Sequence, residues 1–98
     1  MKLVWSARAL ADRRAIYTYI EADDLRAAIT VDERIEVAAR RLADFPDSGR
    51  HGRIEDTREL VIARTPYIAP YRVTGDIVRI LRVIHGARIW PDALLDRD

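Results

Sequence analysis

The amino-acid sequence predicts an α+β fold: an N-terminal strand, a helical hairpin, then a three-stranded antiparallel meander, forming one sheet packed on the helices. Two observations predict it. Apolar residues recur at steps of three and four in the first half of the chain. From Thr57 onward, β-branched and aromatic residues gather in short runs separated by turn residues. At 98 residues, the chain is expected to form a single domain, residues 1–98.

The first strand and the first helix are expected to follow each other directly. Residues 1–6 (MKLVWS) are apolar enough for a strand and too few for a helix. The Ser6 hydroxyl can accept a hydrogen bond from the first turn of a helix over residues 7–22. Arg13 is the exception on the face expected to be apolar, which consists of Leu10, Ile16, Tyr17 and Ile20.

A second helix is predicted after the acidic break at residues 21–24. The break offers an N-cap and places negative charge at the positive end of the next helix dipole. The core-facing positions of this helix step by three and four: Ala28, Val31, Ile35, Ala38, Leu42 and Phe45. This short seam favours packing along the first helix over an intermolecular coiled coil. Residues 46–49 end the helix, and residues 50–53 are expected to continue as a loop.

Three strands are predicted in the second half, at residues 57–64, 67–74 and 77–85. Gly75 and Asp76 fit a tight hairpin between the last two strands, because glycine adopts positive φ without steric cost.

The middle strand has two distinct faces. Tyr71 and Val73 are expected to face the helices together with Tyr67 and Ala69, while Ile68, Pro70, Arg72 and Thr74 share the other face. Pro70 cannot donate a ladder hydrogen bond, which predicts an edge strand or a bulge there. Arg79 and Arg82 fall on opposite faces of the third strand, so at most one of them shares a face with Arg72.

Composition and motifs exclude several classes of function. The absence of cysteine excludes disulfides and thiolate chemistry, and His51 and His85 alone leave too few ligands for zinc. Ser6 and Ser48 lack a nucleophile elbow, and the four glycines lack the spacing of a phosphate loop. We therefore expect no metal and no cofactor. No apolar run approaches eighteen residues, so no membrane partner is expected and the cytoplasm is the expected location.

The C-terminal half is locally basic, although the formal net charge of the chain is only +1. Residues 57–91 carry six arginines and two acidic residues. Positive charge can bind phosphate, aromatic rings can stack on bases and histidine can transfer protons near neutral pH. The candidate surface comprises Arg58, Arg72, Arg79, Arg82, His85, Arg88 and Trp90. The alternative is that several of these arginines pair with acidic residues and that Tyr71 packs in the core.

An ordered set of motifs resembles the RelE/ParE superfamily of toxins from bacterial type II toxin–antitoxin modules. The set comprises TREL at 57–60, PYI at 66–68, YRV at 71–73 and HGAR at 85–88, followed by Trp90 and Pro91. The resemblance spans nearly the whole chain. It implies a helical hairpin on an antiparallel sheet that the N-terminal strand joins.

The resemblance leaves two targets open. RelE-like members cut mRNA in the ribosomal A site, whereas ParE-like members poison DNA gyrase. In a cleaving member, His85 would transfer a proton, and Arg88 and Arg72 would hold the phosphate. The chain departs from that pattern at Ile68, where cleaving relatives commonly carry arginine, and at Trp90, which occupies the neighbourhood of a catalytic tyrosine.

These departures favour a growth-inhibiting toxin that poisons DNA gyrase without performing a chemical step. The alternatives are a ribosome-dependent mRNA endoribonuclease and a non-toxic relative that acts in binding or plasmid stability. The expected partner is a cognate antitoxin in a hetero-oligomer, and no sequence-specific DNA binding by this chain is expected. An antitoxin tail that folds on binding is expected to lay aliphatic residues on the helices and direct acidic residues toward Arg72, Arg79 or Arg82. Residues expected to bind target or antitoxin are Arg58, Arg72, Arg79, Arg82, Arg88 and Trp90.

Overall fold

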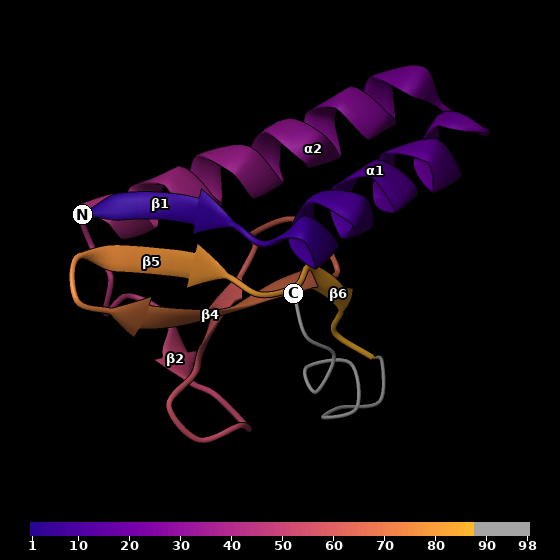
Figure 1. Ribbon diagram of the computed structural model, residues 1–98. Helices are drawn as coiled ribbons and strands as arrows, with labels where there is room; N and C mark the ends of the chain where they lie inside the picture. The colour runs from indigo at the N-terminus through magenta and orange to yellow at the C-terminus, as the bar shows by residue number, and fades with distance from the viewer. Residues whose placement is uncertain (88–98) are drawn as a thin grey trace.

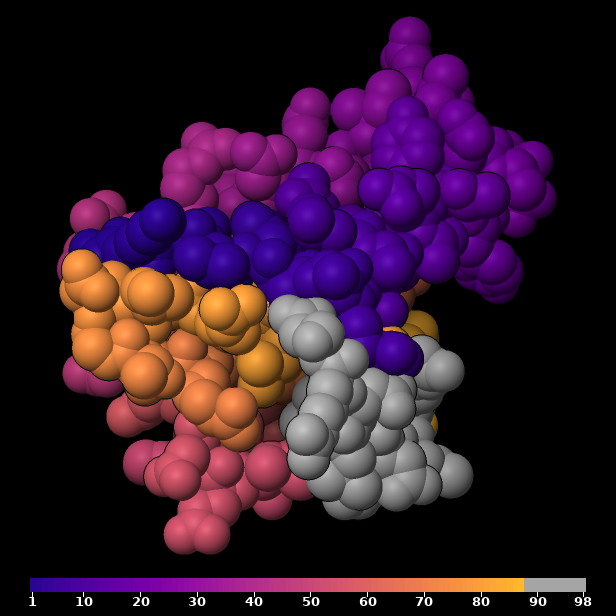
Figure 2. Space-filling model, in the orientation of Figure 1, coloured from indigo at the N-terminus to yellow at the C-terminus, as the bar shows by residue number. Residues whose placement is uncertain are grey.

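Two antiparallel helices cover one face of a six-stranded sheet in the computed structural model, which describes residues 1–87 (Figure 1). The strands lie in the order β1-β5-β4-β3-β2, and β6 pairs with β4 beyond the end of β5. The predicted α+β class is confirmed. The outer end of the hairpin extends beyond the sheet (Figure 2). Within residues 1–87, no helix is long and apolar enough to cross a membrane.

Helix α1 (Ala7–Glu21) begins where the sequence predicts it. Ser6 Oγ accepts a hydrogen bond from Ala9 N at 2.9 Å, and the same hydroxyl donates to Leu81 O at 2.8 Å. The predicted apolar face is wrong in its first turn, because Leu10 is 43% exposed and Ala9 is fully buried. A small side chain at this contact lets the helix approach the sheet closely. The guanidinium of Arg13 lies 4.6 Å from the ring centroid of Trp5, and this cation–π contact explains how a charged side chain can lie on this face of the helix.

Helix α2 (Leu25–Arg40) begins at its predicted acidic cap, where Asp24 Oδ1 accepts a hydrogen bond from Ala27 N at 3.1 Å. The predicted seam is confirmed at Ala28, Ile35 and Leu42, which are buried. It is wrong at Phe45, which is 60% exposed. The α-helical geometry ends at Arg40, and the 3-10 turn η1 (Arg41–Ala43) rotates the following residues away from the seam.

The antiparallel part of the sheet consists of β3 (Arg58–Val61), β4 (Tyr67–Thr74), β5 (Ile77–Ile80) and β6 (Ile84–His85). The predicted hairpin is confirmed, with Gly75 at φ 60° between β4 and β5. The first predicted strand is shorter than expected, and the third is interrupted at residues 81–83.

Pro70 lies within an inner strand, so an edge assignment for β4 is wrong. Its carbonyl accepts a hydrogen bond from Leu81 N at 2.9 Å. The N–H and C=O of one residue in an antiparallel strand point to the same neighbour. A backbone N–H at position 70 would therefore point toward residues 81–83, between β5 and β6. No ladder hydrogen bond is needed at this interruption, so the N–H that proline lacks is not missed.

Strand β1 (Lys2–Trp5) joins the sheet beside β5 as predicted, but the pairing is parallel and the expected all-antiparallel sheet is wrong. Ser6 N donates to Ile80 O at 3.0 Å, and Ser6 Oγ bonds Leu81 O. These bonds hold the start of α1 at the end of β5, so the strand that leads into α1 must run in the same direction as β5.

Strand β2 (Arg50–His51) was not predicted, because residues 50–53 were expected to form a loop. Its two residues pair antiparallel with Glu59 and Arg58 of β3. A two-residue strand is too short to show the alternation by which a strand is recognised in sequence.

The helices cover one face of the sheet, and within residues 1–87 no helix covers the other face, which is called the open face. Tyr71 is fully buried in the core with Ala9 and Ile35, which confirms that it faces the helices. Val73 shares that face but is 37% exposed near the end of β4. Arg72 is exposed on the open face, as predicted.

Candidate functional site

Arg72 and Arg79 lie directly opposite each other on β4 and β5, on the open face of the sheet. Both side chains are exposed. Arginine side chains bind carboxylates and phosphates through charge-assisted hydrogen bonds, so this exposed pair is a candidate site for an anionic group. The structure therefore brings together two of the predicted site residues.

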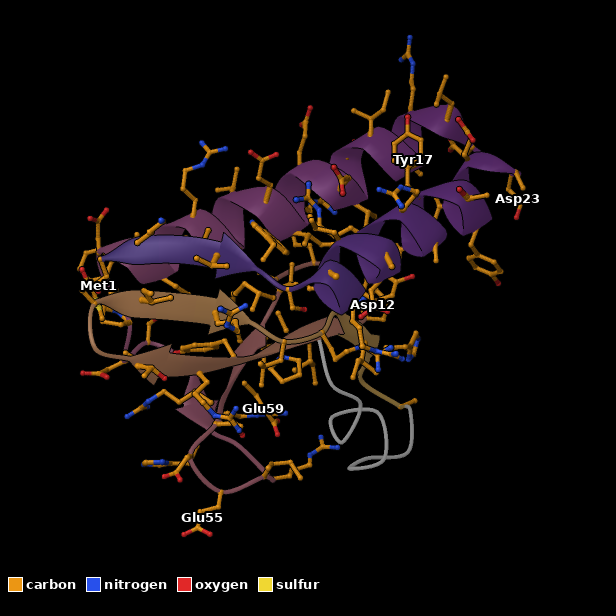
Figure 3. All side chains as sticks on the ribbon, in the orientation of Figure 1. Met1, Asp12, Tyr17, Asp23, Glu55 and Glu59 are labelled. Atoms are coloured by element: carbon orange, nitrogen blue, oxygen red, sulfur yellow. The ribbon has the colours of Figure 1, made fainter. Side chains whose placement is uncertain are left out.

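Glu59 organises a second pair of arginines on the same open face. Glu59 is 1% exposed, and its Oε1 accepts hydrogen bonds from Arg50 Nε at 3.1 Å and Arg50 Nη2 at 3.0 Å. Its Oε2 accepts from Arg53 N at 2.9 Å, with Arg53 Nε at 3.6 Å. Figure 3 shows Glu59 on the side of the sheet away from the helices. This buried carboxylate holds β2, which carries Arg50, and Arg53, which follows β2, beside β3.

Arg58 belongs to the opposite side of the sheet, because it pairs in register with Tyr71. Its Nη1 donates to Gly49 O at 2.8 Å and to Asp47 O at 3.2 Å. The Tyr71 hydroxyl supports the same loop by donating to Pro46 O at 2.6 Å and accepting from Gly49 N at 2.9 Å. Arg58 therefore holds the loop after η1 and does not join Arg72.

Arg82 is buried and forms an ion pair, which corrects its expected place on a binding surface. Its Nε and Nη2 donate to the two carboxylate oxygens of Asp12 at 2.8 and 3.0 Å, and Asp12 also accepts from Val83 N at 2.9 Å. The Arg82 side chain is 8% exposed. Asp12 lies on α1 where that helix faces the sheet (Figure 3). The contact attaches α1 to the interruption between β5 and β6.

His85 faces α1, away from Arg72. It pairs in register with Tyr67, and the two rings meet edge to face at 82° with centroids 5.8 Å apart. Its Nδ1 accepts a hydrogen bond from Ala87 N at 3.1 Å. His85 lines a cavity of about 390 Å³ together with Tyr67 and Tyr19. Burial, and then the nearby Tyr19, raise the pKa of the Tyr67 phenol, so this ring stays neutral at physiological pH.

The predicted catalytic residues do not converge on one point. His85 and Arg72 lie on opposite faces of the same sheet, since their partners Tyr67 and Arg79 do. Ile68 is 8% exposed and offers no charge. Arg88 and Trp90 lie outside the described residues. Among residues 1–87, no group of three or more acidic or histidine side chains could hold a metal ion.

The sequence reasoning missed Asp12 and Glu59 as organising residues. Both are acidic residues in segments that otherwise read as basic or apolar, and each forms hydrogen bonds with a backbone amide and an arginine. Asp12 lies within a predicted helix and Glu59 within a predicted strand, and an acidic residue that becomes buried in such an element needs a partner.

Three comparisons relate the chain to known proteins. Residues 3–90 match the family model described as the ParE toxin of type II toxin–antitoxin system, parDE. The protein Y4kP of Sinorhizobium fredii is 50% identical over 93 residues, which cover 95% of this chain and 96% of Y4kP. Toxin RelE2 of Caulobacter vibrioides is 40% identical over 88 residues, covering 90% and 98% of the two chains. A chain of the solved chromosomal ParDE TA system from P. aeruginosa superimposes with a TM-score of 0.78 at 31% identity, covering 87% of this chain and 95% of that one.

Proposed function

We propose that this chain, which belongs to the ParE toxin family of type II toxin–antitoxin systems, inhibits bacterial growth by poisoning DNA gyrase and is neutralised by a cognate antitoxin. The solved ParDE system supports the antitoxin as a binding partner. The proposed place of action is the cytoplasm, where gyrase works on DNA.

The proposal that the target is gyrase, and not ribosome-bound mRNA, is supported by the separation of His85 from Arg72. Cleavage at a 2′-hydroxyl needs a proton-transfer group and cations around one phosphate, within hydrogen-bond reach of the reacting atoms. His85 faces α1, and the Arg72–Arg79 pair faces the open side of the sheet. This arrangement supports inhibition by docking, in which the paired arginines bind an acidic surface of the target.

The test compares two reactions with the same purified toxin. We expect the toxin to inhibit supercoiling by purified DNA gyrase and to leave mRNA intact on translating ribosomes. His85→Gln keeps a hydrogen-bonding side chain and removes the proton transfer, so it should preserve growth inhibition. Arg72→Glu should weaken growth inhibition by reversing the charge of the docking surface.

Codon-specific cuts in the ribosomal A site that disappear with His85→Gln would overturn the proposal in favour of the endoribonuclease. A wild-type chain that binds its antitoxin but leaves both growth and supercoiling unchanged would instead identify a non-toxic relative.

A further inference from the structure

A band of positively charged side chains crosses the open face of the sheet from β1 to β2. Strand register places Lys2 of β1 on the same side of the sheet as Arg79. It also places Arg50 of β2 on the same side as Glu59 and Arg72. All four cations are exposed. In the order β1-β5-β4-β3-β2, every strand except β3 therefore contributes one of them (Figure 1).

Strand β3 contributes the buried carboxylate that orients one end of this band. Glu59 accepts two hydrogen bonds from the Arg50 guanidinium and one from Arg53 N. The side chains of Arg50 and Arg53 nevertheless remain 52% and 46% exposed. They are held in place and accessible, so less conformational freedom is lost when they bind an anion. The name cation band is used for Lys2, Arg50, Arg53, Arg72 and Arg79.

The cation band is long and carries an excess of positive charge. Neighbouring strands lie about 4.8 Å apart, so β1 and β2, at the two ends of the strand order, lie about 19 Å apart. Glu59 is the only carboxylate at a strand position of this face within residues 1–87, and Asp76 lies in the turn beside Lys2. A single carboxylate would contact one or two of these side chains, whereas duplex DNA presents one negative charge per about 1.7 Å of its axis. The cation band therefore matches an extended polyanion.

Aromatic side chains are missing from the strand positions of the open face within residues 1–87. The aromatic rings of the strands all lie on the helix side of the sheet: Trp5, His51, Tyr67, Tyr71 and His85. Stacking on such rings holds the bases of single-stranded nucleic acids, and aromatic anchors dominate protein interfaces. Contact with a duplex backbone needs positive charge and no ring. The composition of this face therefore favours duplex DNA over single-stranded RNA and over an acidic protein surface.

We propose that the cation band binds the phosphate backbone of duplex DNA and that this contact places the toxin on the DNA held by gyrase. The inference rests on the proposed function for the identity of that DNA, and it names the acidic surface that Arg72 and Arg79 contact. Phosphate contacts carry no sequence information, so the binding is independent of base sequence.

The experiment titrates the purified full chain against a short fluorescent DNA duplex of random sequence, followed by fluorescence anisotropy between about 50 and 200 mM KCl. Arg72→Gln and Lys2→Gln each remove one positive charge from the cation band, on different strands. Arg26→Gln is the matched control, because Arg26 is an exposed arginine of α2 and lies outside the sheet. A single-stranded RNA of the same length is the comparison probe. Thermal melting by circular dichroism checks the folding of all three variants.

We expect the wild type to bind the duplex with a slope of log K against log salt concentration of about −3 to −4, as about four phosphate contacts predict. Arg72→Gln and Lys2→Gln should each weaken binding about tenfold at about 50 mM KCl and make this slope shallower by about 1. Arg26→Gln should bind like the wild type. Equal losses for Arg26→Gln and Arg72→Gln, or a wild type that does not bind the duplex at about 50 mM KCl, would overturn the inference.

Two other partners give different results, each of which overturns the inference. Tighter binding of the single-stranded RNA than of the duplex would assign the cation band to RNA. Binding to gyrase without DNA that Arg72→Gln weakens, together with no binding to the duplex, would assign it to an acidic protein surface.

The duplex titration contains no gyrase, so it tests the cation band separately from the proposed function. A wild type that binds the duplex through the band but leaves supercoiling unchanged would support the backbone contact and contradict the proposed function alone.

Discussion

Replacing Asp12 by alanine should cause a larger loss of stability than removing any other carboxylate on the helical hairpin. The change removes the carboxylate that accepts two hydrogen bonds from Arg82, whose side chain is 8% exposed, and that also accepts a bond from Val83 N. Removing one member of a buried ion pair takes away compensation for the charge that remains and costs about 3 to 5 kcal/mol. We expect about 3 kcal/mol here, because Asp12 is itself 15% exposed and water reaches part of the site.

Thermal and urea unfolding followed by circular dichroism measure this loss. For a domain of this size, about 3 kcal/mol corresponds to a melting temperature lowered by about 12 to 24 °C. Asp32→Ala is the matched control, since Asp32 also accepts two bonds from an arginine, Arg13, but is 32% exposed. It should cost about 1 kcal/mol.

A double variant isolates the cause. Asp12→Ala with Arg82→Met should be more stable than Asp12→Ala alone, because the buried guanidinium that has lost this carboxylate is then removed as well. Equal losses for Asp12→Ala and Asp32→Ala, or a double variant whose loss equals the sum of the two single losses, would refute the argument that burial makes this ion pair strong.

Three further predictions concern Tyr71 and its neighbours. Tyr71→Phe keeps the buried ring and removes the hydrogen bonds to Pro46 O and Gly49 N, so urea unfolding should show a loss of about 1 to 3 kcal/mol. Arg72→Ala should change the free energy of unfolding by less than about 0.5 kcal/mol. Equal losses would show that the two faces of β4 are misassigned. Burial raises the pKa of Tyr71 in the folded state, so the stability that the neutral phenol contributes is complete below the unfolded pKa near 10 and is lost as pH rises through the folded pKa. Above about pH 10, the free energy of unfolding of Tyr71→Phe should therefore fall less steeply with pH than that of the wild type. Gly49→Ala would bring its Cβ to 2.6 Å from the Tyr71 ring and hydroxyl, so it should lower the melting temperature, and an unchanged melting temperature would contradict this contact.

Local capping and turn chemistry made much of the fold predictable. Ser6 and Asp24 cap the two helices through hydrogen bonds to residues three positions later, and Gly75 supplies the positive φ of the hairpin. These signals depend on a few neighbouring residues, so they can be recognised before the tertiary structure is known. The family motifs then indicated how the elements assemble.

The parts that could not be predicted depend on residues far apart in the chain. Pro70 is tolerated in an inner strand because the facing strand is interrupted, and the buried Arg82 pairs with Asp12, which lies 70 positions away. For the same reason, the arginine cluster separated into different roles: Arg72 and Arg79 share an exposed face, while Arg58 and Arg82 hold structural contacts.

The parallel pairing of β1 with β5 has a consequence for biosynthesis. Ser6 and Leu81 are hydrogen-bonded although they lie 75 positions apart, and β1 has no other strand partner in the described fold. Strand β1 must therefore wait until β5 has been synthesised before it can dock, and such long-range closure slows folding. At about 5 to 20 residues per second, the nascent chain spends several seconds without its complete sheet. A product that terminated before β5 would leave β1 unpaired, so a cell would not be exposed to the complete sheet until β5 had been made.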